Sequence, residues 1–292
     1  AVVKLPHYRR VDLAVPYFRT RTSIMAAEPN YINYATFVPN DTNYFRQWGP
    51  GRIQAEAAWD TEKGNANLVI AIIDTGVDLT HPDLAAKLVP GKDFVNNDDD
   101  PSDDNGHGTH CAGIAAAVSN NNLGVAGIAM NCIIMPIKVL AGAGFGSTDW
   151  IISGIQHAAD NGAKILSLSL GGYGGGAAME DAVNYAWGKG CIVLGGAGND
   201  AQNQLFYPAA YEKSIAVGSS DPDDARSDFS NFGSTWVDVA APGSNIYSTL
   251  PGGNYGSQSG TSMACPMAAG AVGLVWSRMG LTATNTAVRA QL

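Results

Sequence analysis

The chain of 292 residues has little charge and no long apolar run. Only 15% of its residues are charged, and none of its apolar stretches is long enough to span a bilayer, so we expect no membrane-embedded segment. Acidic residues (26) outnumber basic ones (17), which gives a formal net charge of −9. This balance offers no electrostatic reason to bind nucleic acid or an anionic membrane, and we expect neither as a partner.

Cysteine is also scarce. The chain has four, without a Cys-x-x-Cys pair: Cys111, Cys132, Cys191 and Cys265. This spacing argues against metal or redox chemistry based on cysteine. Buried free thiols are the expected state, although the sequence leaves a disulfide among them open.

Short β-branched apolar runs alternate with helical stretches from about residue 66 onward. The expected strands are 68–73, 132–139, 164–168, 191–194 and 214–218, and the expected helices are 149–161, 177–189 and 262–279. Near-continuous apolar strands are typical of a parallel sheet that is covered on both sides. The pattern predicts an α/β fold with a doubly wound, mostly parallel central sheet and helices on both faces.

Polar or glycine-rich stretches follow several of these strands, at 74–76, 143–146, 169–172 and 196–199. Ligands of open α/β sheets bind at the carboxyl ends of the strands. The clustering therefore predicts one cleft, without naming a reaction.

Ser262 stands at the start of an expected helix, after Gly260 and Thr261. A serine hydroxyl becomes a nucleophile when a base takes its proton and a third group orients that base. The free N–H groups of a helix start also suit a developing oxyanion. Taken alone, however, a helix-capping serine is the more common explanation.

Two further residues supply the groups that Ser262 would need. His107 lies between glycines at the entry to an apolar helix; with His110 it forms an HxxH pair, but no third ligand at zinc spacing follows. Asp74 ends an apolar strand, where a carboxylate is costly to bury unless it is hydrogen-bonded. Its Asp-Thr-Gly also occurs in aspartic proteases, which need two copies, whereas this chain has one. Asp, His and Ser follow here in the subtilisin order.

The chain resembles the subtilisin-like (subtilase) serine peptidases, most closely their thermitase-like branch. The motifs that carry the resemblance are Ile73-Asp74-Thr75-Gly76-Val77, His107-Gly108-Thr109-His110-Cys111-Ala112-Gly113 and Gly260-Thr261-Ser262-Met263-Ala264. The similarity extends from about Pro39 to the last residue. It implies a secreted, monomeric serine endopeptidase that hydrolyses proteins or peptides with broad specificity through an acyl-enzyme intermediate.

The resemblance also assigns roles in the cleft. Asp74 would orient His107, the general base and then acid, and Ser262 would attack. The side chain of Asn199 would complete the oxyanion hole with the Ser262 backbone N–H. The substrate backbone would add as a strand between two segments, Gly144-Phe145-Gly146 and Ser169-Leu170-Gly171.

Phe206 departs from the family pattern. Relatives often carry a smaller residue there, at the base of the primary specificity pocket. If the ring points inward, bulky P1 side chains would be excluded. The neighbouring Tyr207–Pro208 pair matches a family position where the peptide bond is cis.

Structural Ca²⁺ is the cofactor that the resemblance implies, at two sites of hard oxygen ligands. The first would use the side chains of Asp41, Asp83 and Asn121 and the carbonyls of Val118, Leu123 and Val125. The second would use Asp93, Asn96, Asp98 and Asp100, with Ser102 or Asp103 nearby. The family usually has another carboxylate at the position of Asn96, so we expect the second site to bind more weakly.

The first 34 residues differ from the rest, with three prolines and four of the arginines. By resemblance, residues 1–34 are the end of a propeptide, a natural partner of the enzyme, and maturation would occur near Tyr34. Residues 35–292 would then form the peptidase domain, without the C-terminal strand and helix with which relatives continue.

Two other interpretations remain open from sequence. A catalytically silent or truncated subtilase fold that acts as a binding module would carry the same motifs. A dinucleotide-binding protein is less well supported, because Gly142-x-Gly144-x-Gly146 lacks the spacing of the fingerprint and its acidic residue.

Overall fold

The computed structural model describes residues 2–6, 9–31 and 36–292. The chain divides into two compact units, Ala1–Thr36 and Phe37–Leu292. The first unit contains helix α1 (Val11–Arg19), which has no buried residue. The expected boundary between residues 34 and 35 and the maturation site near Tyr34 lie outside the described residues.

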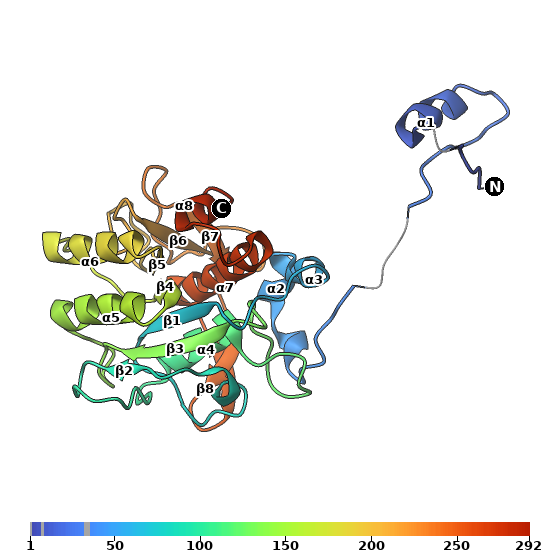
Figure 1. Cartoon of the computed structure of the whole chain (residues 1–292). Helices are drawn as coiled ribbons and strands as arrows, with labels where there is room; N and C mark the ends of the chain where they lie inside the picture. Colours follow the sequence, from blue (N-terminus) through green and yellow to red (C-terminus); the bar gives the residue numbers. More distant parts are fainter. Residues whose placement is uncertain (1, 7–8, 32–35) are drawn as a thin grey trace. The chain divides into compact units, whose positions relative to one another are not determined.

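The second unit is built around a seven-stranded parallel sheet in the order β2-β3-β1-β4-β5-β6-β7 (Figure 1). Its strands are β1 (Val69–Asp74), β2 (Lys92–Asp93), β3 (Ile133–Lys138), β4 (Ala163–Leu168), β5 (Ile192–Gly196), β6 (Ser214–Ser220) and β7 (Val239–Pro242). The order reverses between β1 and β4, because β2 and β3 lie on one side of β1, whereas β4 to β7 follow one another on the other side. The carboxyl ends of β1 and β4 therefore adjoin a place where the fold can form a cleft.

Helices cover both faces of the sheet (Figure 1). The helices of this unit are α2 (Trp48–Arg52), α3 (Ala55–Trp59), α4 (His107–Ala116), α5 (Thr148–Asp160), α6 (Ala177–Gly188), α7 (Thr261–Met279) and α8 (Asn285–Arg289), with 3-10 turns at Tyr44–Arg46 and Ala85–Lys87. β1 shows why two layers form. Ile70 and Ile72 pack with residues of α4 and α7, whereas Ala71 and Ile73 pack with residues of α5 and α6.

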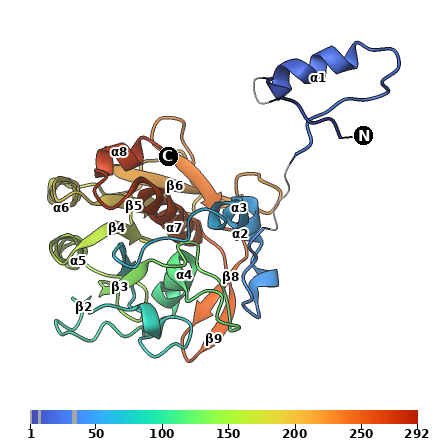
Figure 2. The same cartoon turned by 45° about the vertical axis from the view of Figure 1, so that its right-hand side comes forward.

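The predicted doubly wound fold is confirmed, and α5, α6 and α7 lie within one residue of their predicted bounds. The antiparallel hairpin of β8 (Ile246–Leu250) and β9 (Asn254–Gln258), which packs against α4, was not predicted (Figure 2). All four cysteines are buried and none forms a disulfide, as expected. No helix in the described ranges is long and apolar enough to cross a membrane.

Candidate active site

A carboxylate and an imidazole meet at the carboxyl edge of the sheet. Asp74, the last residue of β1, is fully buried, and His107 is the first residue of α4. Asp74 Oδ1 accepts a hydrogen bond from His107 Nδ1 at 2.7 Å, since an ionised carboxylate can only accept. With the proton on Nδ1, Nε2 of the neutral ring keeps a lone pair, which a general base requires.

Asp103 joins the end of β1 to the start of α4. Its Oδ1 accepts hydrogen bonds from Thr75 Oγ1 at 2.8 Å and from the backbone N–H groups of Asn105 and Gly106. Its Oδ2 accepts from the backbone N–H of Thr109 at 2.9 Å and from its hydroxyl at 2.5 Å. An aspartate at a helix start satisfies N–H groups that the helix leaves without partners. Asp103 thus fixes the helix that carries the imidazole.

β1 and α4 approach each other so closely that Gly108 has no room for a side chain. A Cβ there would lie 2.1 Å from Gly76 O and 3.1 Å from Asp74 Cβ. Any larger residue at position 108 would push α4 away from β1 and separate the His107 imidazole from the Asp74 carboxylate. This position therefore requires glycine.

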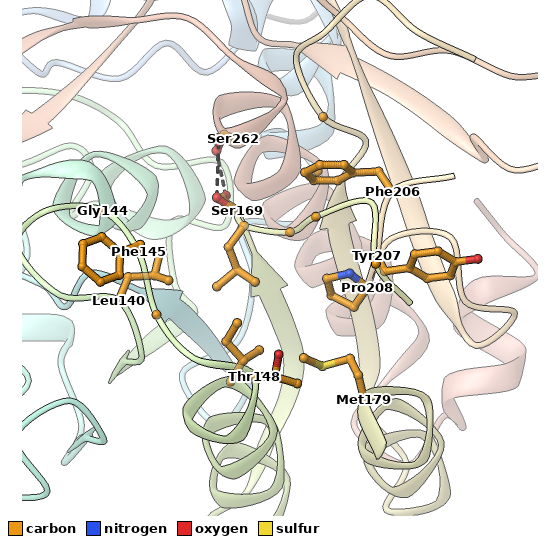
Figure 3. Close-up of a pocket in the computed structure, with 18 of the residues that line it drawn as sticks. Leu140, Gly144, Phe145, Thr148, Ser169, Met179, Phe206, Tyr207, Pro208 and Ser262 are labelled. Atoms are coloured by element: carbon orange, nitrogen blue, oxygen red, sulfur yellow. Dashed lines mark hydrogen bonds between the residues drawn. The ribbon is translucent and has the colours of Figure 1, made fainter. Parts of the chain in front are cut away.

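Ser262 lies in the first turn of α7, opposite the loop that follows β4. Its Oγ donates a hydrogen bond to the carbonyl of Ser169 at 3.3 Å, and Ser169 Oγ donates to the carbonyl of Ser262 at 2.8 Å (Figure 3). In the described part of the chain, no hydrogen bond joins Ser262 Oγ to His107. Both residues line the same cleft.

The amide of Asn199 is oriented by the residue before Ser262. Asn199 Oδ1 accepts hydrogen bonds from the backbone N–H of Thr261 at 2.8 Å and from its hydroxyl at 3.1 Å. The Thr261 hydroxyl in turn accepts from Gly198 N at 3.1 Å. With the oxygen so held, Asn199 Nδ2 is the atom left to donate to a ligand in the cleft. Sequence reasoning missed Thr261, although it stands directly before the serine.

These residues surround one cleft of about 680 Å³. Its lining includes His107, Asn199 and Ser262, together with every residue expected to bind substrate: Gly144, Phe145, Gly146, Ser169, Leu170, Gly171 and Phe206. Leu140, Thr148 and Met179 also line the cleft and were not predicted (Figure 3). Those side chains come from the ends of other elements, so no local motif marks them.

Comparison with known proteins identifies the family. The model of the subtilase family matches residues 65–292. The chain is 53% identical over 251 residues to thermitase from Thermoactinomyces vulgaris, covering 85% of this chain and 88% of the relative. It is 48% identical over 269 residues to a thermophilic serine proteinase from Bacillus sp. (strain AK1), covering 92% and 67%. The chain belongs to the subtilase family.

A solved structure agrees with this assignment. A protease from Pseudoalteromonas arctica PAMC 21717 superimposes with a TM-score of 0.81 at 32% identity, covering 87% of this chain and 91% of that one. The chain is thus a subtilisin-like serine endopeptidase, as the three motifs predict. The dinucleotide-binding interpretation is wrong.

Charge and burial act in opposite directions on the imidazole of this subtilase. The nearby Asp74 carboxylate raises the pKa of His107 above its usual value, and this effect exceeds the opposing effect of burial. Cys111 lies beside the pair, and its thiol donates to the Ser262 carbonyl at 3.3 Å. Burial raises the pKa of Cys111 well above its usual range, so the thiol stays protonated and does not compete as a nucleophile.

Lys138 is a buried cation that sequence reasoning did not assign. It ends β3 directly opposite Asp74 in the sheet. Its Nζ donates to the carbonyl of Thr75 at 2.7 Å, to the carbonyl of Leu140 at 3.1 Å and to Asp104 Oδ1 at 2.5 Å. It thereby joins the end of β1, the rim of the cleft and the loop before α4. The one indication in the sequence of a role for Lys138 is that it is a charged residue inside the otherwise apolar predicted strand 132–139.

Phe206 points into the cleft, between two of its walls. A Cβ on Gly171 would lie 2.5 Å from Phe206 Cε1, and a Cβ on Gly198 would lie 3.1 Å from Phe206 Cδ2. The ring therefore occupies the slot between the two backbone segments. The Tyr207–Pro208 bond that follows is cis, as expected.

The residues of the first expected calcium site fit a cation. The carboxylates of Asp41 and Asp83 are buried, and neither forms an ion pair within the described residues. Burial raises the pKa of both, and Asp41 further raises that of Asp83 by repulsion. Asp41 Oδ1 is buried without a hydrogen-bond partner in the described part of the chain. Two such carboxylates are stabilised by a hard cation.

The remaining ligands of this site lie around the same two carboxylates. Asn121 Nδ2 donates to Asp83 Oδ1 at 2.8 Å, and rotation of that amide would present its oxygen instead. The Val118 N–H donates to the Asp83 backbone carbonyl at 2.8 Å, and the Val125 N–H donates to the Asp83 carboxylate oxygen Oδ2 at 2.8 Å. The adjoining Asn43 N–H donates to the Gly124 carbonyl at 2.7 Å, which ties the start of this unit to the loop.

The second expected calcium site is arranged differently. Asp93 accepts from Val95 N, Asn96 N and Asn96 Nδ2, at 2.6, 3.0 and 2.9 Å. The exposed Asp98 and Asp100 each accept from residues two positions ahead. In the ranges that the structure describes, these carboxylates do not converge within 4.8 Å of one another. Asp103, named as a neighbour of this site, instead holds the start of α4.

Proposed function

We propose that this endopeptidase cleaves peptide bonds by acyl transfer to Ser262, with His107 as base and acid and Asp74 as its orienting carboxylate. The observation that carries the proposal is the 2.7 Å hydrogen bond from His107 to buried Asp74 at the edge of a cleft that also contains Ser262. His107 Nε2 takes the Ser262 proton while Oγ attacks the carbonyl carbon. The proton then passes to the leaving amine, and a water repeats the sequence to release the acid.

The oxyanion of each tetrahedral intermediate would be bound by the Ser262 N–H and by Asn199 Nδ2. Two hydrogen bonds from Thr261 fix that amide before substrate arrives. A donor held in place in this way is worth about 3–4 kcal/mol of transition-state stabilisation.

Substrate recognition would combine backbone pairing with a restricted P1 subsite. Gly144-Phe145-Gly146 and Ser169-Leu170-Gly171 both line the cleft, and a substrate backbone would add between them as a strand. Such pairing favours broad sequence tolerance. Phe206, wedged between Gly171 and Gly198, would narrow that tolerance at P1 by excluding bulky side chains.

We also propose one structural calcium ion, held by Asp41, Asp83, Asn121 and the neighbouring carbonyls of Val118, Leu123 and Val125. When bound, the ion would neutralise two buried carboxylates and tie the start of the peptidase unit to the loop after α4. Binding to the folded state alone stabilises that state. The acids at 93–100 carry a weaker case for a second ion, because they are already hydrogen-bonded or exposed.

Residues 1–34 are proposed to be a propeptide remnant, and the mature enzyme to be a secreted monomer. The separate compact unit at Ala1–Thr36 supports the first part, and the resemblance alone supports secretion. Intact-mass measurement after incubation should show loss of the segment before Tyr34. An unchanged mass in an enzyme that is otherwise active would contradict this.

A serine-reactive phosphonate tests the central proposal. The full chain should be labelled at Ser262, and Ser262→Ala should not be labelled. Equal labelling of both would place the nucleophile elsewhere. No labelling of either folded protein would favour the silent fold that acts as a binding module.

A further inference from the structure

Two loops form the walls of the slot that Phe206 occupies. One wall is the segment after β4, which includes Gly171, and the other is the segment after β5, which includes Gly198. The family resemblance places Phe206 at the base of the primary specificity pocket, so the P1 side chain would enter this slot. In Figure 3, Phe206 and Phe145 lie on opposite sides of Ser169, so the two rings belong to different parts of the cleft.

The backbone that carries Phe206 is fixed to the first wall. Gly172 N donates to the Tyr207 carbonyl at 2.9 Å, and Tyr207 N donates to the Gly172 carbonyl at 2.8 Å. The ring can therefore leave the slot only by changing its own side-chain rotamer. Whether the Phe206 ring can change rotamer depends on the side chain that packs against it.

A side chain from the first wall packs against the ring and bonds to the second wall. The rings of Tyr173 and Phe206 meet edge to face, with centroids 5.2 Å apart and planes at 80°. The Tyr173 hydroxyl donates a hydrogen bond to Asp200 Oδ2 at 2.5 Å. Asp200 follows directly after Asn199, the proposed oxyanion-hole residue. Asn231 Nδ2 donates to the same hydroxyl at 3.3 Å. Tyr173 thus contacts the ring in the slot and joins both walls.

The second wall is itself held rigidly. Asn231 is buried, and its Oδ1 accepts from Asp200 N at 3.1 Å and from Gln202 N at 3.0 Å. Its own backbone N–H donates to the Gly198 carbonyl at 2.9 Å. Asp200 therefore presents its carboxylate to Tyr173 from a fixed loop, and the Tyr173–Asp200 hydrogen bond links the two walls of the slot.

We propose that Tyr173 and Asp200 are specificity-determining residues of this peptidase. Their hydrogen bond holds Phe206 in the slot and restricts P1 to small side chains, of the size of Gly, Ala or Ser. The inference rests on the proposed function and names the substrate class of the same site. Removing the bond frees Tyr173, lets Phe206 rotate outward and admits larger P1 residues. Neither residue contacts the triad, so the effect falls on P1 selection.

The test uses the full chain and peptide substrates that differ only at P1 (Ala, Leu or Phe). The variants are Tyr173→Phe, Asp200→Ala, their double variant, and Phe206→Gly. Tyr185→Phe is the matched control, because Tyr185 is as exposed as Tyr173 (39% against 38%) and donates to Asp160 at 2.8 Å outside the cleft. Phosphonate titration counts active sites in every preparation, so kcat/KM refers to folded enzyme.

Wild type should cleave after Ala in preference to Phe. Opening the slot in Phe206→Gly should raise the Phe-to-Ala ratio of kcat/KM by about tenfold or more. Tyr173→Phe and Asp200→Ala should each raise it several-fold, whereas Tyr185→Phe should not. Because both act through one bond, the double variant should match the single ones.

Three results would overturn the inference: a wild-type preference for P1 Phe, an unchanged ratio in Tyr173→Phe, or additive effects in the double variant. Each can occur in an enzyme that the phosphonate labels at Ser262, which leaves the proposed acyl transfer intact. A preference for P1 Phe would also overturn the proposed restriction of P1 by Phe206. Absence of labelling would instead refute the proposed function.

Discussion

The two ends of helix α4 show two ways in which this subtilase accommodates buried carboxylates. At the amino end, Asp74 and Asp103 accept hydrogen bonds from an imidazole, hydroxyls and backbone N–H groups of the protein itself. Beyond the carboxyl end, Asp41 and Asp83 repel each other, and one oxygen has no partner in the described part of the chain. Asp74 Oδ2 also lacks a hydrogen-bond partner in the described part of the chain, but the Asp74 carboxylate is paired with the His107 imidazole. The carboxylates of Asp41 and Asp83 form no ion pair within the described residues, and this arrangement calls for a cation.

Replacing the orienting carboxylate should have the largest effect. In Asp74→Asn, an amide in place of the carboxylate favours the wrong tautomer of His107, so kcat should fall about 10⁴-fold. Steady-state kinetics on a peptide substrate measures the loss. Asp160→Asn, an aspartate outside the cleft, should retain near wild-type kcat. A loss below about tenfold in Asp74→Asn would remove Asp74 from the mechanism.

Removing calcium should act on stability rather than on the chemical step. If the ion is present at about 1,000 times its Kd, its loss costs about 4 kcal/mol, or roughly 10 °C in Tm. Thermal melts with calcium and with EDTA measure this. Asp83→Asn should melt at a lower temperature from the outset and respond little to EDTA. Identical midpoints for wild type with and without the chelator would show that this end of α4 is stable without an ion.

The decline of kcat/KM at low pH depends on His107, at the amino end of α4. The Asp74 carboxylate raises the pKa of His107 above 6.5, and the ring must be neutral to accept the serine proton. kcat/KM should therefore fall as the pH drops through a value above 6.5. In Asp74→Asn that midpoint should move downward, because the charge is lost while burial of the ring remains. An unmoved midpoint would mean that another group titrates.

Sequence alone predicted the layers of the fold, and it singled out Asp74, His107 and Ser262, the proposed triad, at a strand end and two helix starts. Parallel strands buried on both faces leave long apolar runs, and the triad residues sit in motifs that the backbone demands, as the crowding at Gly108 illustrates. The β8–β9 hairpin was not predicted, because its strands mix apolar and polar residues and lack the continuous apolar run of the sheet strands. Its hydroxyls bond α4, with Ser248 Oγ donating to the His110 carbonyl at 2.9 Å.

Residues that act through distant partners could not be found in this way. The roles of these residues depend on partners that are distant in sequence. Thr261 bonds to Asn199, Lys138 to Thr75, and Tyr173 to Asp200. The acidic run at 98–104 shows how neighbouring acids differ in role. Asp103 holds the start of α4 and Asp104 pairs with Lys138, whereas calcium binding by Asp98 and Asp100 stays a prediction. Composition identified the acids, but burial and partners decide what each one does.

The smallest effect is expected where acidic residues are exposed. Asp98 and Asp100 accept local backbone and hydroxyl hydrogen bonds and reach solvent, so Asp98→Ala should shift stability by less than about 1 kcal/mol, with or without calcium. Asp83→Ala, measured in the same melts, should lose its calcium response. If Asp98→Ala instead lowers Tm in calcium but not in EDTA, the loop binds an ion after all. Burial would then not explain which of these aspartates bind a cation, and loop flexibility would have to account for binding at Asp98.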